Sequence, residues 1–249
     1  MQATTAITAT LGVLVLVAWA VLQRNSAYGY FGIAALSWTV HASLVLTTEI
    51  PVPALYWETL IVGSLMWVVV AMMMFALRFA GLRRPWLERG AVVYAAVVPF
   101  LLVTAGLGRI FLVGNVILLG LLGIGVYEFK VLLDVARARR TIDSRLLIVA
   151  ALCVLVLGAH DWLNRQGAWA YAEPFAMHYG LPVLFLTVFW NLLGQASAAR
   201  RTAEDLNREL EARVEAKTAE IEQAQSHLRA IDAAKALAAE RERIMRDMH

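Results

Sequence analysis

The sequence has 249 residues, of which 60% are hydrophobic and 16% are charged, whereas roughly a quarter of the residues in a soluble domain are charged. This composition excludes an ordinary soluble domain and predicts a polytopic membrane protein. The net charge of +3 arises before residue 196, where 12 Lys and Arg face 8 Asp and Glu, because the remainder carries 10 against 11. The basic surplus therefore belongs to membrane loops and does not support nucleic-acid binding.

Seven segments are apolar over about the 20 residues that a helix needs to cross the hydrocarbon core. Only Gly108 and Arg109 separate the fourth segment from the fifth, so six spans are the alternative, with one segment merged or dropped. The first segment has no basic residue before it and Arg24 after it, the reverse of a cleaved signal peptide. It is therefore predicted to be a retained helix with the N-terminus outside. The segments cover residues 5–22, 28–46, 56–77, 91–107, 110–129, 146–163 and 175–193.

The distribution of basic residues favours seven spans over six. Short cytoplasmic loops collect Lys and Arg, and with seven spans only Arg109 and Arg165 lie on the side opposite to the other basic loop residues. This topology places the C-terminus in the cytoplasm. The one cysteine, Cys153, lies within an apolar run, which excludes an intrachain disulfide and a CxxC site.

Three histidines lie in the predicted spans, and the topology brings all three to the outer third of the bilayer. They are His41 in the second span, His160 in the sixth and His178 in the seventh, and Asp161 is adjacent. Ionisable residues inside a membrane are costly and indicate a functional site by default. Three imidazoles at one depth suit zinc or copper, a heme, a shared proton switch or a small polar ligand. The alternative is that each histidine binds a neighbouring helix or interfacial water.

Other polar residues in the spans are assigned structural roles. Glu128, near the inner end of the fifth span, is placed at the cytoplasmic interface beside Lys130. Asn115 and Asn191 are expected to join helices by interhelical hydrogen bonds.

From Ala196 the sequence changes to a long polar helix without Gly or Pro. Apolar residues at spacings of three and four form the seam of a coiled coil, which Lys217 and Lys235 interrupt. Beyond Ile231 the apolar positions 237, 244 and 248 are out of register by one residue. This is either a phase break that stores a rotation or register change, or an ordinary heptad imperfection. A parallel coiled coil that leaves a membrane bundle predicts a homodimer. The seam contains Leu210, Val214, Ile221, Ala224, Leu228 and Ile231.

Two stretches of this helix resemble parts of bacterial sensor histidine kinases. Residues 203–220, AEDLNRELEARVEAKTAE, are similar to the linker of these kinases, which also precedes cyclase and other output domains. Residues 240–249, ERERIMRDMH, resemble the H-box of the subfamily whose dimerisation domain reads E-R-x-R-I-x-R-D-x-H, and every fixed position is met. The resemblance implies that His249 is the phosphoacceptor and that Arg246 and Asp247 flank it.

The resemblance also implies cofactor, partners and location. A neutral imidazole nitrogen is a suitable nucleophile toward a γ-phosphoryl group, and the implied ATP would be bound by a domain that follows His249. The implied partners are a second copy of the chain, the lipid bilayer of a bacterial inner membrane, and a response regulator with a helix-turn-helix output domain. Kinase activity is expected of the intact protein and not of this chain, which stops before the ATP-binding domain.

We therefore predict an all-α protein in three parts. Residues 1–195 form a seven-helix transmembrane sensor domain similar to bacterial seven-helix receptor modules, residues 196–239 a coiled-coil signalling linker, and residues 240–249 the start of the dimerisation domain. The alternative function is a membrane transporter, or a heme- or metal-binding redox protein, that its helical tail dimerises. A retinal photoreceptor is excluded, because none of the three lysines lies in the middle of a span.

Overall fold

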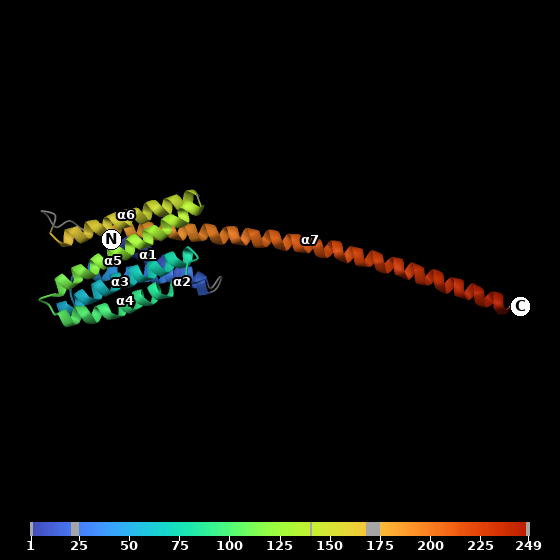
Figure 1. The fold of residues 1–249 in the computed structure, drawn as a ribbon, viewed down its shortest axis with the longest axis horizontal. Coiled ribbons are helices and arrows are strands. Elements are labelled where there is room, and N and C mark those ends of the chain that lie inside the picture. Colours follow the sequence, from blue (N-terminus) through green and yellow to red (C-terminus); the bar gives the residue numbers. More distant parts are fainter. Residues whose placement is uncertain (1, 21–24, 140, 168–174, 248–249) are drawn as a thin grey trace. The chain divides into compact units, whose positions relative to one another are not determined.

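The computed structural model describes residues 2–20, 25–139, 141–167 and 175–247. Over these residues the protein is all-helical, with no strand (Figure 1). The helices are α1 (Gln2–Ala18), α2 (Ser26–Leu46), α3 (Ala54–Phe79), α4 (Pro85–Ala105), α5 (Ile110–Arg139), α6 (Ile142–Arg165) and α7 (Met177–Asp247).

Among the described residues, six helices are long and apolar enough to cross a bilayer, namely α2 to α7. The chain is therefore a helical membrane protein. Helix α1 is apolar but has only 17 residues, fewer than the roughly 20 that span a hydrocarbon core, so the first predicted span stays a prediction. The fourth and fifth predicted spans are separate helices, because α4 ends at Ala105, Gly106 takes a φ of 68°, and α5 begins at Ile110.

Polar side chains fix the starts of two helices. Asn25 Oδ1 accepts a hydrogen bond from the Ala27 amide at the start of α2. At the start of α6, Thr141 and Ser144 form a reciprocal capping box, in which each side chain accepts from the other residue's backbone N–H. These bonds satisfy amides that have no partner within a helix.

The chain divides into two units, residues 1–193 and 194–249. Two apolar cores stabilise the first unit, and α3 contributes to both. In one core, Phe31 of α2 packs against Phe75 of α3 and Phe185 of α7, with each pair of ring centroids 5.7 Å apart. The other core packs α3 against α4 and α5 around Met66 and Leu102.

An ion pair joins α3 to α4 at the end of the bundle that the sequence predicts to be cytoplasmic. Arg78 Nη1 and Nη2 donate to the two carboxylate oxygens of Glu88, each at 2.7 Å. The Arg84 amide also donates to Glu88, at 3.0 Å, and the Arg78 guanidinium lies 5.9 Å from the Tyr30 ring centroid of α2. These contacts fix the short turn between α3 and α4.

In the described residues, the second unit is the remainder of α7. Three predicted seam residues, Leu210, Val214 and Ile221, each expose half or more of their surface. A coiled coil buries such residues against a second helix, so the pairing of two chains stays a prediction.

Candidate ligand-binding site

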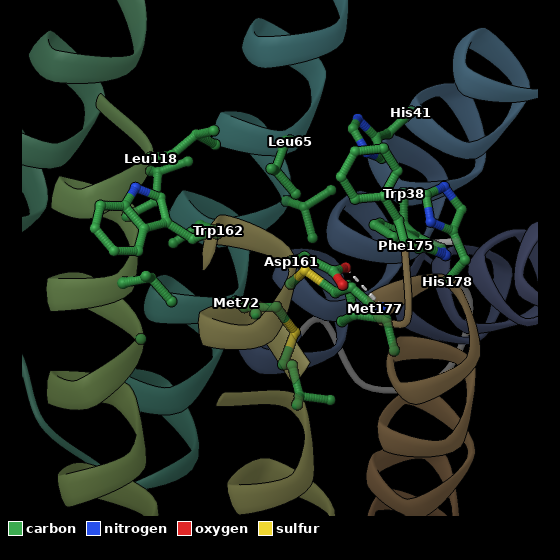
Figure 2. A pocket seen from close by; sticks show the side chains of 18 of the residues that line it. Trp38, His41, Leu65, Met72, Leu118, Asp161, Trp162, Phe175, Met177 and His178 are labelled. Atoms are coloured by element: carbon green, nitrogen blue, oxygen red, sulfur yellow. Dashed lines mark hydrogen bonds between the residues drawn. The ribbon is translucent and has the colours of Figure 1, made fainter. Parts of the chain in front are cut away.

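A cavity of about 320 Å³ lies between α2, α3, α5, α6 and α7 in the first unit (Figure 2). Small-molecule sites in proteins usually measure about 300 to 1,000 Å³ and have mostly apolar walls with a few polar groups. This cavity has that character, because apolar side chains make up most of its wall and half of the lining residues are leucine, valine or methionine. Its ionisable side chains are His41, Glu58, Glu128, Asp161, Arg165 and His178.

His41 from α2 and His178 from α7 meet in the cavity. Their rings are stacked, with centroids 5.8 Å apart and an interplanar angle of 26°, and Trp38 lies 5.1 Å from each ring (Figure 2). His41 Nδ1 donates to the Ile61 carbonyl oxygen at 3.1 Å. Both histidines are buried. The backbone of Phe175 lies close to the His178 ring, but neither ring nitrogen of His178 has a partner with hydrogen-bond geometry among the described residues. His178 is therefore the imidazole available to a ligand.

Asp161 of α6 fixes the start of α7. Its two carboxylate oxygens accept hydrogen bonds from the Ala176 amide at 2.8 Å and from the Met177 amide at 2.9 Å. Figure 2 shows Asp161 beside Met177. A carboxylate in this position satisfies free amides of the first helical turn and interacts favourably with the helix dipole. Because His178 follows Met177 directly, Asp161 also determines where the His178 ring lies.

The structure brings together two of the three histidines that the sequence singled out. His160 does not line the cavity, and its Nδ1 instead lies 3.1 Å from Asp161 Oδ1. In the part of the chain that the structure describes, no three His, Cys, Asp or Glu side chains form a group that would hold a metal ion. The metal or heme at the outer histidines stays a prediction that rests on the sequence.

A polar cluster lies at the predicted outer end of the cavity. Arg165 Nη2 is 3.6 Å from Glu58 Oε2, and Arg165 Nε donates to Asn115 Oδ1 at 3.2 Å. Trp162 Nε1 donates to the Asn115 carbonyl oxygen. Asn115 therefore joins α5 to α6, and Asn191 joins α7 to α6 by donating to the Asp143 carbonyl oxygen. The interhelical role predicted for both asparagines is confirmed.

Glu128 of α5 lines the same cavity. Its Oε1 is buried and has no hydrogen-bond partner among the described residues. The sequence placed this residue at the cytoplasmic interface beside Lys130 and did not connect it with the histidines. The available signal was a carboxylate within an otherwise apolar run, which is costly in a membrane.

The residues of the predicted H-box lie in the second unit or beyond the described chain. Arg246 and Asp247 are the last two residues of α7. The predicted phosphoacceptor, His249, lies outside the described residues.

No family model, curated protein or solved structure matches this chain.

Proposed function

We propose that the protein is the sensory half of a homodimeric membrane histidine kinase. A signal binds in the cavity between α2, α3, α5, α6 and α7, and α7 transmits the binding to the phosphoacceptor His249. The proposal rests on the extent of α7. One helix, Met177–Asp247, contains both His178 in the cavity and the Arg246–Asp247 pair of the H-box.

The contacts of Asp161 explain how a ligand bound in the cavity would affect the start of α7. A ligand that binds His178 lies next to the first turn of α7, which Asp161 holds through two backbone amides. A ligand shifts a conformational equilibrium only by its difference in affinity for the two states. The predicted phase break after Ile231 gives the paired helices a place where two such states differ in register.

The proposed chemistry is phosphoryl transfer to an imidazole. A nitrogen of His249 attacks the γ-phosphorus of ATP, so that a P–N bond forms while the P–O bond to ADP breaks. The ATP-binding domain would be supplied by protein sequence that follows His249. The phosphoryl group would pass to a response regulator, for which we propose a helix-turn-helix output domain. The site of the reaction is the cytoplasmic side of a bacterial inner membrane.

The test is phosphorylation of the full-length protein in lipid nanodiscs with γ-labelled ATP. We expect a label that is stable in alkali and lost in acid, as a phosphohistidine is. The label should disappear in His249→Gln and remain in His227→Gln, which changes the other histidine of the tail. Undiminished label in His249→Gln, or a reading frame that stops after His249, contradicts the proposal.

A further inference from the structure

The cavity has unpaired hydrogen-bonding groups at two places. At one place are the two ring nitrogens of His178, and at the other is Oε1 of Glu128, none with a partner among the described residues. Buried polar groups in proteins nearly always have a hydrogen-bond partner, and an unpaired one is energetically costly. Both places therefore require a partner that the described side chains do not supply.

The helix contacts show how far apart these two places are along the bundle. The first turn of α7, with His178, lies level with Asp161 of α6. In α5, a Cβ placed on Gly125 would lie 3.5 Å from Leu155 of α6. Because α5 and α6 run in opposite directions, Glu128 lies about one turn beyond Leu155, on the side away from Asp161. At 1.5 Å per helical residue, the levels of His178 and Glu128 differ by roughly 12 Å.

The wall between these two levels is hydrocarbon. A row of ordered waters that bridges the two polar places would need polar partners along the way, and this part of the wall offers few. Two glycines, Gly125 and Gly158, line the cavity where α5 faces α6, and a Cβ at either would come within 3.5 Å of a leucine on the other helix. The apolar side chains in this stretch include Leu122, Val154, Leu155, Leu181 and Leu184.

The charged groups near His178 already have partners. Asp161 accepts two backbone hydrogen bonds, and Glu58 is paired with Arg165 at 3.6 Å. The free group at this end is therefore an imidazole, which in its neutral form donates one hydrogen bond and accepts another. A hydroxyl or keto group matches that capacity, and it avoids placing a further formal charge beside these ion pairs.

We infer that the cavity binds an elongated aliphatic molecule with an uncharged hydrogen-bonding group at the His178 end and a hydrogen-bond donor at the Glu128 end. One end pairs with His178, the other pairs with Glu128, and the chain between them packs against the leucine-rich wall. The inference rests on the proposed function, because it names the ligand class of the proposed sensory cavity.

Binding is measured on the full-length protein in lipid nanodiscs with two matched probes. Dodecane-α,ω-diol has a hydroxyl at each end, whereas dodecanol has a hydroxyl at one end only. Tryptophan fluorescence reports occupancy, because Trp38, Trp57 and Trp162 line the cavity. Affinities are compared at equal mole fraction of probe in the lipid, so that partitioning into the bilayer cancels. We expect the diol to bind about tenfold more tightly, as one additional hydrogen bond to a buried group implies.

Three variants locate the binding. Gly125→Val narrows the apolar stretch and should abolish diol binding. Gly123→Val is its matched control, because a Cβ at Gly123 meets nothing within 4 Å, and it should bind the diol like the wild type. Glu128→Leu should retain binding but make the affinities of diol and dodecanol equal, which separates loss of the polar partner from loss of the fold.

Equal affinity of the two probes for the wild-type protein overturns the inference, and so does diol binding that Gly125→Val leaves unchanged. Phosphorylation of His249 is an independent measurement. If His249 is labelled by ATP but the diol does not bind, only the ligand class is wrong. If the diol binds as described but His249 is not labelled, the kinase proposal is wrong and the binding site remains.

Discussion

Asp161 is the residue on which the start of α7 depends most directly. Its carboxylate accepts from the Ala176 and Met177 amides and lies 3.1 Å from His160 Nδ1, while its side chain is only 11% exposed. Hydrogen bonds to a charged group contribute about 1.5 to 3 kcal/mol. Asp161→Ala removes the acceptor for both amides, so the first turn of α7 should open more often than in the wild type.

Hydrogen exchange measures that opening. In Asp161→Ala, the peptide that contains Ala176 and Met177 should exchange about tenfold faster or more, because about 1.4 kcal/mol corresponds to a factor of ten. The start of α6 is an internal control, because the capping box of Thr141 and Ser144 does not involve Asp161. Unchanged exchange at the start of α7 would show that Asp161 does not hold this helix.

For single residues, the sequence predicts the depth in the membrane but not the direction in which the side chain points. Each helical residue advances the helix by a constant rise, so the number of residues from a helix end gives a residue's depth in the membrane. This count places His41 and His178 at the same depth. The sequence does not predict the direction in which a side chain points around the helix axis, because lipid-facing and protein-facing residues in a membrane helix are equally apolar. For that reason His160 was expected beside the other two histidines, and Glu128 was not connected with them.

Among the elements, α3 and α4 provide a separate test, because a bidentate ion pair joins them. The side chains of Arg78 and Glu88 are each 16% exposed. Glu88→Gln retains the shape of the side chain but leaves Arg78 without its counter-charge. Partly buried bidentate pairs exceed the usual contribution of a surface pair, so we expect a loss of about 1 to 2 kcal/mol in unfolding free energy.

Thermal unfolding in nanodiscs measures this loss. Glu88→Gln should unfold at a lower temperature than the wild type, whereas Arg89→Gln, which changes an exposed residue on the same helix, should not. Equal unfolding temperatures for the wild type and both variants would show that the ion pair does not stabilise the turn.

Hydropathy predicted the apolar segments of the helices better than the residues at which the helices end. The fifth predicted span stopped at Phe129, but α5 continues to Arg139. The seventh predicted span stopped at Leu193 and a polar helix was predicted from Ala196, whereas α7 is one helix from Met177 to Asp247. A hydropathy window measures the thickness of the hydrocarbon core, whereas a helix ends where a cap or a glycine ends it. Gly106, with its positive φ, is such an end, and it separates α4 from α5.

For the whole molecule, the central open prediction is that two chains pair along α7. Leu210, Val214 and Ile221 are half or more exposed in the single chain. Burying a large aliphatic side chain contributes about 1.5 to 3 kcal/mol, so a second copy of this stripe is a favourable partner. Ion pairs such as Arg213 with Glu209, at 2.6 Å, lie within one helix and do not depend on a partner.

Cysteine cross-linking tests the pairing and its register. In a parallel coiled coil, Ile221 lies in the seam, where the two copies of one residue approach within reach of a disulfide. Ser226, five residues later, lies on the side away from the seam. In a Cys153→Ser background, which removes the exposed native thiol, mild oxidation of membranes should link Ile221→Cys into dimers several-fold more than Ser226→Cys.

Equal linking at both positions would indicate random collision, and no linking at Ile221→Cys would contradict the parallel seam. Because the proposed signal passes from α7 to His249 through paired helices, the second result would also remove the route by which the cavity controls phosphorylation.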